Sequence, residues 1–311
     1  MKLSLPRPTI AFAVLALAAS AVAGCGSSNS NNTTSSSSSS STSSSTSSTA
    51  SGADSTVAAL VPAAIKSKGT LTVAADASYA PNEFIGSDGK TVQGMDADLA
   101  KALASVMGLK AKVVNQTFDS IIPGLASNKY DLGMSSFTDT KEREKTVDFV
   151  TYFSAGTSFY AKAQGAPSVN GLADLCGLKV AVEKGTTQAD DANAQSKKCT
   201  AAGKKGVTVS VFPDQNGANL AISSGRAQIG MADSPVADYQ VKKSNGQFKL
   251  LGTPYGTAPY GIAMNKKSGL AKPVLAGMKA LIANGKYKAI LTHWGIQSGA
   301  ITSPIINGAT S

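Results

Sequence analysis

The sequence contains few of the side chains that most often carry out catalysis or bind metals. Its 311 residues include a single histidine and three cysteines. The histidine, His293, stands beside Trp294 in a predicted terminal helix, where a packing or surface role is expected. We find no nucleophile–base constellation, metal cluster, phosphate loop or dinucleotide fingerprint. The sequence therefore predicts no cofactor and no metal site, and it favours ligand binding over catalysis.

Acidic residues are also scarce. The chain has 19 Asp and Glu against 29 Lys and Arg, which gives a formal net charge of +10. An excess of this kind can indicate binding to nucleic acid or to acidic lipids. The lysines, however, are scattered over predicted helix surfaces and loops, without an arginine-rich stripe or interleaved aromatic residues. We therefore expect solvated lysine faces and no nucleic-acid partner.

A long apolar run is absent beyond the first 24 residues, so no membrane-spanning helix is expected there. Residues 1–24 themselves have the pattern of a signal peptide, with Lys2 and Arg7 ahead of the apolar run Ile10–Ala19. The segment ends in Val22-Ala23-Gly24-Cys25, which resembles a bacterial lipobox. This pattern predicts a lipid-modified Cys25 and an extracytoplasmic protein anchored to the cell membrane. The alternative is an ordinary signal peptide followed by an unmodified cysteine.

The segment after Cys25 is almost wholly Ser, Thr and Asn as far as about Ser51. Such a segment cannot bury enough apolar surface to offset the entropy of ordering. We therefore predict a disordered tether over residues 25–60, which holds a globular domain away from the membrane surface.

The number of cysteines in the chain predicts one disulfide. If Cys25 carries lipid, Cys176 and Cys199 remain, and an oxidising compartment would join them. The alternative is a pair of unpaired thiols.

The remaining residues, about 250, alternate between strand and helix patterns. The expected strands cover residues 69–76, 111–115, 130–135, 179–182, 207–212 and 228–232. Helices are expected over 94–108, 120–127, after 187, around Leu220 and Ile222, over 270–283 and over 287–294. Pro123 is expected in the first turn of its helix. This alternation predicts an α/β fold with mainly parallel sheets.

The segment from Met134 to Arg143 places hydroxyl groups, a backbone N–H and an arginine within ten residues. A free amino acid is a zwitterion, and its carboxylate suits the planar fork of Arg143 together with the N–H of Thr138. Its ammonium group needs oxygen acceptors, and Ser136, next to Ser135, can supply one. The segment therefore predicts a site for a free amino acid.

Three motifs are similar to those of the polar-amino-acid solute-binding proteins of bacterial ABC importers, the family 3 periplasmic binding proteins. Gly94-Met-Asp-Ala-Asp-Leu99 is similar to the family's G-[FY]-D-[IV]-D-L, with Met95 and Ala97 as departures. The run from Ser135 to Phe149 and the C-terminal run from Gly285 to Gly295 also resemble the family. A further departure is Asn82, where an aromatic residue often follows the proline.

The resemblance covers about residues 66–294 and implies a type II periplasmic-binding-protein fold with a ligand cleft between two lobes. Lobe 1 would comprise residues 61–152 and 261–311, and lobe 2 residues 158–255. Residues 153–157 and 256–260 would be the hinge segments, and the lobes would close over the ligand. The family also implies a monomer that delivers a free amino acid to a membrane permease and its ATPase.

The family's carboxylate-binding arginine corresponds to Arg143, although an ion pair with Glu142 or Glu144 on a charged surface helix is the alternative. Thr186 and Thr187 open a helix, where free N–H groups favour an anion, although simple capping is the alternative.

Asp233 is implied as an acceptor for the ammonium group, although a helix cap is the alternative. Tyr79 and Phe118, expected in loops after strands, match the aromatics that sandwich the ligand side chain.

The side-chain end of the ligand is predicted to meet Asp76 and Glu183. Two acids near one pocket favour a ligand with a positive side chain, because unpaired buried carboxylates are costly. The alternative is that Glu183 pairs with Lys184 or solvent. We therefore expect a polar or cationic amino acid as the ligand.

Two other functions are possible on the same scaffold. One is an enzyme similar to cyclohexadienyl dehydratase, for which Glu183 would be the only plausible acid in the cleft. The other is a ligand-sensing partner of a membrane kinase.

Overall fold

The computed structural model describes residues 52–310. The predicted signal peptide, the predicted lipidation site Cys25 and the tether up to residue 51 lie outside the described residues. None of the helices in the described part combines the length and the apolarity that a membrane crossing requires.

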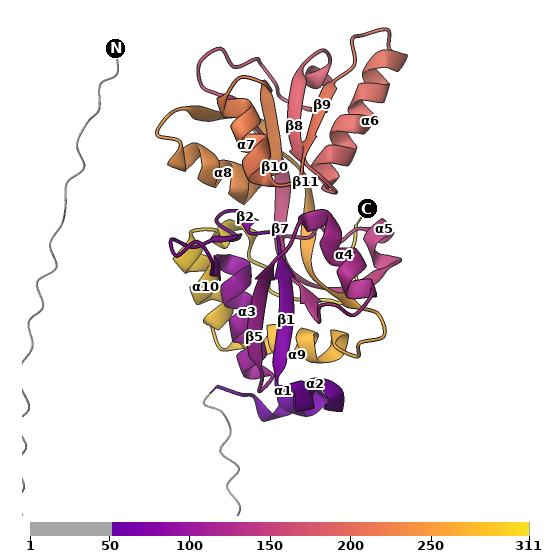
Figure 1. The fold of residues 1–311 in the computed structure, drawn as a ribbon, viewed down its shortest axis with the longest axis vertical. Coiled ribbons are helices and arrows are strands. Elements are labelled where there is room, and N and C mark those ends of the chain that lie inside the picture. The colour runs from indigo at the N-terminus through magenta and orange to yellow at the C-terminus, as the bar shows by residue number, and fades with distance from the viewer. Residues whose placement is uncertain (1–51, 311) are drawn as a thin grey trace, which may run out of the picture. The chain divides into compact units, whose positions relative to one another are not determined.

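An eight-stranded sheet runs through the molecule (Figure 1). Its strands, in the order in which they lie side by side, are β5 (Lys110–Asn115), β1 (Thr70–Ala75), β6 (Leu132–Gly133), β11 (Phe248–Asn265), β7 (Val147–Lys162), β10 (Ile229–Asp233), β8 (Lys179–Glu183) and β9 (Thr208–Phe212). All pairs are parallel except those that involve β7 or β11. A small antiparallel sheet is formed by β2 (Ser78–Tyr79), β3 (Glu83–Ile85) and β4 (Val92–Gln93).

Helices cover both ends of the large sheet. They are α1 (Ser55–Leu60), α2 (Ala63–Lys68), α3 (Met95–Val106), α4 (Phe118–Ala126), α5 (Lys141–Glu144), α6 (Thr187–Ala201), α7 (Gln215–Ser223), α8 (Ser234–Lys243), α9 (Ala271–Ala283) and α10 (Lys286–Trp294). Two short 3₁₀ helices are η1 (Leu172–Leu175) and η2 (Gln297–Gly299).

The elements form two lobes, which share β7 and β11. We call lobe 1 the half that contains β1 to β6 with α1 to α5, α9 and α10, drawn below in Figure 1. Lobe 2 contains β8, β9 and β10 with α6, α7 and α8, drawn above. The predicted α/β fold of the type II periplasmic-binding-protein class is therefore confirmed.

Each lobe has its own hydrophobic core. In lobe 1, Leu99 and Leu103 lie on one face of α3 at helical spacing and are fully buried against the sheet and α9. Gly108 ends this helix in the left-handed conformation (φ 72°), which glycine adopts without strain. In lobe 2, Val180 and Ile229 are fully buried under the small residues on the inner face of α6.

The tether prediction was wrong at its C-terminal end, because residues 55–60 form α1. The Asp54 carboxylate accepts hydrogen bonds from the N–H groups of Thr56 and Val57 and so caps this helix. Val57 and Val61 are buried in the core of lobe 1. The folded domain therefore begins near Asp54, where the first apolar side chains can be buried.

The position of Pro123 was also predicted wrongly. It lies inside α4, which begins at Phe118, two residues earlier than expected. The missing N–H removes one hydrogen bond from a helix of nine residues. Burial of Ile121 and Leu125 on either side of the proline holds the helix together.

The predicted disulfide between Cys176 and Cys199 is present in the structure. It joins the segment after η1 to the last turns of α6, and the two cysteines are 23 positions apart in the sequence. Cys199 is buried in the core of lobe 2, so the bond fixes the outer helix of this lobe to its sheet.

We expect the double variant Cys176→Ala/Cys199→Ala to unfold with a free energy lower by roughly 3 kcal/mol, because the unfolded chain gains the freedom of an open loop. Urea denaturation followed by circular dichroism measures this difference. Each single variant breaks the same bond and should lose a similar amount. A double variant as stable as the parent would contradict the prediction.

Candidate functional site

A cavity lies between the two lobes. Its volume, which includes a part open to solvent, is ≈ 290 Å³. All eleven residues that the sequence predicted as ligand contacts line it. They are Asp76, Tyr79, Phe118, Ser135, Ser136, Thr138, Arg143, Glu183, Thr186, Thr187 and Asp233. The structure adds Glu83 and Gln188, which the sequence analysis missed.

The position of the cavity follows from the parallel strands. Asp76 follows β1, Glu183 ends β8 and Asp233 ends β10. The carboxyl ends of parallel strands meet at one edge of a sheet, which is where α/β proteins place their ligands. The strand β1 runs in the opposite direction to β8 and β10, so the carboxyl edges of the two lobes meet at the cavity. Because β1 belongs to lobe 1 and the other two strands to lobe 2, both lobes contribute acids to one cavity.

Arg143 lies on α5, a short helix that is capped by the Thr140 hydroxyl. Its guanidinium donates to the carbonyl oxygens of Thr138 (2.8 Å) and of Gly185 in lobe 2 (2.9 Å). It also lies over the rings of Phe118 and Phe137, at 5.3 and 5.5 Å from their centroids. Two of its five N–H groups are used in these bonds, so three remain to hold an anion.

The alternative of a surface ion pair for Arg143 is wrong. Glu142 pairs with Lys145, and Glu144 pairs with Lys141. Burial lowers the pKa of Arg143 to about 10, so the guanidinium stays charged at neutral pH.

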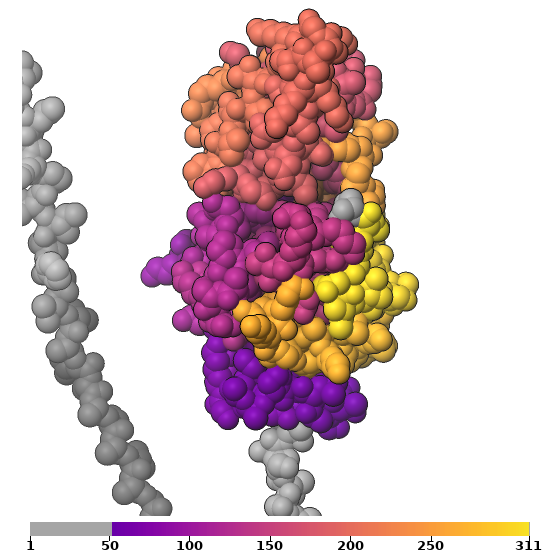
Figure 2. Space-filling model, turned by 90° about the vertical axis from the view of Figure 1, so that its right-hand side faces the viewer, coloured from indigo at the N-terminus to yellow at the C-terminus, as the bar shows by residue number. Residues whose placement is uncertain are grey.

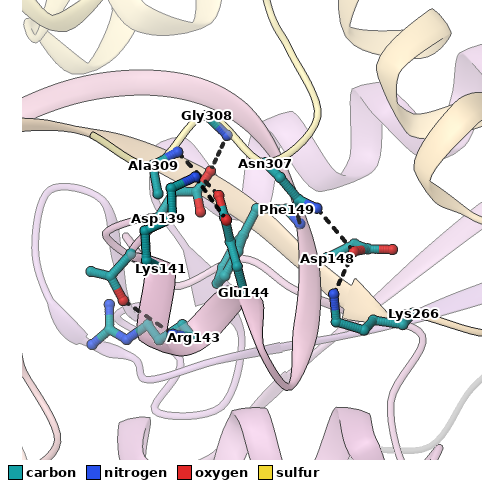
Figure 3. A network of polar contacts seen from close by, with 11 residues as sticks. Asp139, Lys141, Arg143, Glu144, Asp148, Phe149, Lys266, Asn307, Gly308 and Ala309 are labelled. Atoms are coloured by element: carbon teal, nitrogen blue, oxygen red, sulfur yellow. Dashed lines mark hydrogen bonds and ion pairs between the residues drawn. The ribbon is translucent and has the colours of Figure 1, made fainter. Parts of the chain in front are cut away.

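The C-terminal segment holds the turn that carries Arg143 (Figures 2 and 3). The N–H of Gly308 donates to Asp139 Oδ2 (2.7 Å), and the N–H of Ala309 donates to Glu144 Oε1 (3.2 Å). Figure 3 shows both bonds directly above the turn, with Asn307 bound to Asp148 beside them. The carboxylates around Arg143 are therefore occupied by the C-terminal backbone and leave the guanidinium free to face the cavity.

Backbone N–H groups surround the guanidinium. The residues on either side of Thr138 pair with β11, through the N–H of Asp139 and the carbonyl of Phe137. In an antiparallel bridge of this kind, the N–H of the middle residue points away from the partner strand. The N–H of Thr138 therefore points to the same side as its carbonyl oxygen, which accepts a hydrogen bond from Arg143. On the other lobe Thr186 caps α6, which leaves the N–H groups of Thr187 and Gln188 without an acceptor inside the helix. These N–H groups can donate to an anion at the Arg143 end of the cavity.

Asp233 lies near this end and is buried. It accepts hydrogen bonds from Gln188 Nε2 (2.7 Å) and from the Tyr260 hydroxyl (2.7 Å). Burial raises the pKa of Asp233 to about 6, while these two hydrogen bonds and Arg143 act in the opposite direction. Gln188 was missed because its place in the first helical turn gives no sequence signal for a side chain directed at the neighbouring strand.

The two predicted aromatic residues lie in the cavity, but not in the loops that we expected. Phe118 is the first residue of α4, and its ring stacks on Phe137 with centroids 4.5 Å apart. Tyr79 lies in β2, and its hydroxyl oxygen accepts from the N–H of Asp233 (2.8 Å). The second contact crosses from lobe 1 to lobe 2, so Tyr79 also joins the lobes.

Asp76 and Glu183 both line the cavity, and both are buried. Asp76 Oδ2 accepts from the N–H of Phe118 (2.9 Å), whereas the buried Oε1 of Glu183 has no hydrogen-bond donor among the described residues. Glu183 is only 2% exposed. The alternative of a pair with Lys184 is wrong, because that lysine pairs with Asp119 (2.7 Å) on the outside. Burial is the main cause that raises the pKa of Asp76 and, well above its ordinary value, that of Glu183.

A second acid pair supports the two serines. The hydroxyls of Ser135 and Ser136 donate to the two oxygens of Glu83 (3.3 and 3.2 Å). Asp96 accepts from the N–H of Ser136 and from the Tyr152 hydroxyl, both at 2.9 Å. Burial raises the pKa of Asp96 to about 6 and that of Glu83 well above its ordinary value. Because each serine hydroxyl donates its hydrogen bond to Glu83, its oxygen can accept one from a group in the cavity.

The glycine of the first sequence motif allows the Glu83 segment to approach. A Cβ atom on Gly94 would lie 2.2 Å from the Asn82 carbonyl oxygen, and its φ of 121° is one that L-residues rarely adopt. Asn82, predicted as a departure from the family, is fully buried and donates to the Ser136 hydroxyl (2.9 Å). This asparagine therefore takes part in the support of the serines.

Several contacts close the cavity from both sides. Two of them are the bonds from Arg143 to the Gly185 carbonyl and from the N–H of Asp233 to the Tyr79 hydroxyl. In addition, the N–H of Gln215 donates to the Ser78 hydroxyl (3.0 Å), and Lys184 pairs with Asp119. Each contact joins a residue of lobe 1 to one of lobe 2. Within residues 52–310 no group of three or more His, Cys, Asp or Glu side chains is placed to hold a metal ion.

Known proteins share this architecture. The family model for bacterial extracellular solute-binding proteins, family 3, matches residues 71–297. The arginine-binding protein ArgT of Corynebacterium glutamicum is 35% identical over 81% of this chain and 82% of its own length. The L-arginine-binding protein of Pseudomonas aeruginosa is 36% identical over 71% of this chain and 85% of its own.

A solved structure of an ancestral arginine-binding protein bound to arginine superimposes with a TM-score of 0.66. It has 36% sequence identity to this chain, and the match covers 73% of this chain and 98% of the ancestral protein. The match to the family model extends over most of the described residues and includes every residue that lines the cavity. The chain therefore belongs to the bacterial extracellular solute-binding proteins, family 3.

Proposed function

We propose that this protein binds a basic amino acid, with arginine as the preferred ligand, and delivers it to the permease and ATPase of an ABC importer. The observation that carries the proposal is one cavity that is lined by the guanidinium of Arg143 and by two buried acids, Asp76 and Glu183. A ligand with a carboxylate at one end and a cation at the other would compensate both. The two relatives named above, both called arginine-binding proteins, support this ligand.

The α-carboxylate of the ligand is proposed to bind Arg143, the N–H of Thr138 and the start of α6 at Thr186 and Thr187. These groups supply a planar fork and N–H donors, which is the geometry that a carboxylate requires. The positive end of the macrodipole of α6 adds to the attraction.

The α-ammonium group is proposed to donate to Asp233 and to the hydroxyl of Ser136, which is supported by Ser135. The ligand stem would pass between Tyr79 and Phe118. Because every amino acid has the same carboxylate and ammonium groups, these contacts give affinity without choosing the side chain.

Hinge closure is the proposed mechanism. We place the hinges at residues 153–157 and 256–260, with lobe 2 formed by residues 158–255 and lobe 1 by residues 61–152 and 261–311 together with α1. The register between β7 and β11 shifts between Leu251 and Tyr255, between Tyr255 and Ala258 and again after Tyr260. A strand pair with register shifts is held by fewer regular backbone hydrogen bonds than a continuous pair. These shifts lie where the two strands pass between the lobes, which is where a hinge is needed.

The protein is proposed to act as a monomer held at the outer face of the cell membrane by a lipid on Cys25. The Ser/Thr-rich segment up to about Ser51 would be the tether that lets the domain reach the permease. We propose a binding protein and not an enzyme, because the acids and the arginine of the cavity suit the charged groups of a free amino acid.

Isothermal titration calorimetry against a panel of amino acids tests the ligand. We expect L-arginine to bind most tightly, L-lysine less tightly, and L-glutamine more weakly than either. L-glutamate should not bind, because a third carboxylate would meet Asp76 and Glu183. The protein must first be freed of bound amino acid by unfolding and refolding. Preference for glutamate, or no binding of any basic amino acid, would contradict the proposal.

Replacing Arg143 with alanine should weaken arginine binding on the order of 100-fold, because it removes a charged partner worth about 3 kcal/mol from a desolvated carboxylate. Arg226→Ala is the matched control, since Arg226 is exposed and lies over the ring of Phe212, a residue that does not line the cavity. The control should bind arginine like the parent. Equal affinities of the Arg143 variant and the parent would show that the carboxylate binds elsewhere.

A further inference from the structure

Asp233, the proposed acceptor for the ligand ammonium group, lies against the connection between the lobes. It ends β10, and it pairs with Thr157 in the antiparallel ladder between β10 and β7. Thr157 belongs to one of the two proposed hinge segments, residues 153–157 of β7 and 256–260 of β11. Both strands pass from one lobe to the other (Figure 1). The ammonium acceptor is therefore a direct neighbour of a hinge segment.

Both carboxylate oxygens of Asp233 are hydrogen-bonded toward the hinge segments. Oδ2 accepts from the hydroxyl of Tyr260 (2.7 Å), the last residue of the second segment. Oδ1 accepts from the side-chain amide of Gln188 (2.7 Å), and the same amide nitrogen donates to the Thr157 hydroxyl (2.9 Å). Asp233 is thus bonded to one hinge segment directly and to the other through Gln188.

The donor from Tyr260 is held in place by the core of lobe 1. Its ring is almost fully buried and packs against the rings of Phe153 and Tyr152, with centroids 5.3 and 6.0 Å apart. A close-packed core leaves such a ring little freedom to turn. The hydroxyl therefore belongs to lobe 1, whereas Asp233 belongs to lobe 2, and the bond between them crosses the hinge.

The titratable groups around Asp233 come from several elements. Among the described residues, those whose charges interact with Asp233 are Tyr79 of β2, Arg143 of α5, Glu183 of β8, and Tyr255 and Tyr260 of β11. Burial raises the pKa of each of the three tyrosines, so their hydroxyls stay neutral at neutral pH. Arg143 is the cation of this set.

Opposing effects determine whether Asp233 is ionised. Burial raises its pKa to about 6, and the bonds from Tyr260 and Gln188 are the largest of the effects that lower it, followed by the charge of Arg143. An ionised carboxylate only accepts hydrogen bonds, so these two donors favour the ionised form. Loss of either bond should therefore raise the pKa of Asp233 further.

We propose that Tyr260 and Gln188 are positioning residues, which tie the ammonium acceptor Asp233 to both hinge segments. The proposal rests on the proposed function, because it requires Asp233 to bind the α-ammonium group of an amino acid. Each donor uses one lone pair of one oxygen and leaves the others for the ligand. The carboxylate is thereby oriented and ionised before the ligand enters.

The same bonds couple ammonium binding to the hinge. A rotation of the lobes that lengthens the bond between Tyr260 and Asp233 would make Asp233 a weaker acceptor. By linkage, a ligand ammonium group that binds the ionised carboxylate favours the hinge angle at which this bond is made. Tyr260 and Gln188 would then contribute to closure as well as to affinity.

Replacing Tyr260 with phenylalanine tests the proposal, because it removes the hydroxyl and keeps the ring. Asp233 should then hold its proton to a higher pH, and a protonated acid is a poor partner for an ammonium group. For the parent, affinity for L-arginine should rise with pH through about 6 and then level off. The variant should level off at a higher pH. We expect it to bind about tenfold more weakly than the parent at about pH 5 and almost equally at about pH 8.

Isothermal titration calorimetry of the ligand-free proteins at several pH values measures this ratio of dissociation constants. Asp76 and Glu183 also lie in the cavity with raised pKa values, but they are present in both proteins. Their titration therefore affects parent and variant alike and cancels in the ratio. A side chain that only supports the fold would change affinity by the same factor at every pH.

Tyr287→Phe is the matched control. Tyr287 is buried in the core of lobe 1, its hydroxyl donates to the Tyr152 carbonyl (2.8 Å), and it does not line the cavity. The ratio of its dissociation constant to that of the parent should not depend on pH. Gln188→Met removes the other donor at similar length and should reproduce the pH-dependent ratio, also where Tyr260→Phe fails to fold.

A ratio that stays constant with pH in the folded Tyr260 and Gln188 variants would overturn the positioning role and leave the proposed function in place. A parent protein that binds no free amino acid at any pH would overturn the proposed function and this inference with it.

Discussion

Buried carboxyl groups without a cationic partner of their own are the constraint on which the rest of this structure depends. Glu183 is 2% exposed and Asp233 is 7% exposed, and neither forms an ion pair inside the cavity, although Arg143 lowers the pKa of Asp233. Burying a charge of this kind costs several kcal/mol unless it is compensated. The protein can take up a proton or a ligand cation, or it can move its lobes apart and let water in. Each of these changes the state of the cleft, and so the acids couple the contents of the cavity to the position of the lobes.

The architecture makes this coupling possible because the acids come from different lobes and only β7 and β11 connect them. The parallel strands direct Asp76, Glu183 and Asp233 to one place, while each lobe keeps a separate hydrophobic core. Rotation of one lobe therefore leaves both cores intact and changes only the contacts across the cavity. The turn that carries Arg143 lies wholly on lobe 1, where the backbone of Gly308 and Ala309 holds it in place.

Much of this arrangement could be predicted from the sequence, and the failures have physical causes. The patterns of apolar residues predicted the strands that carry Asp76 and Glu183, because burial in a sheet imposes a pattern on the chain. The end of the tether was predicted wrongly because α1 is short and buries a single residue, Val57. One buried residue produces no helical periodicity in the sequence. Glu83 was missed for a related reason. Its segment, β3, has only three residues, and its side chain is directed at the serines by tertiary contacts that no local pattern records.

Selectivity must lie at the end of the cavity where amino acids differ. In the proposed binding mode the contacts around Arg143 and Asp233 meet groups that every free amino acid has, so they would bind all candidates alike. Asp76 and Glu183 would meet the side chain, and one of them comes from each lobe. A ligand whose side chain cannot compensate two carboxylates would therefore leave buried charge between the lobes. Under this proposal the choice of ligand and the closure of the cleft are the same event, because one pair of acids takes part in both.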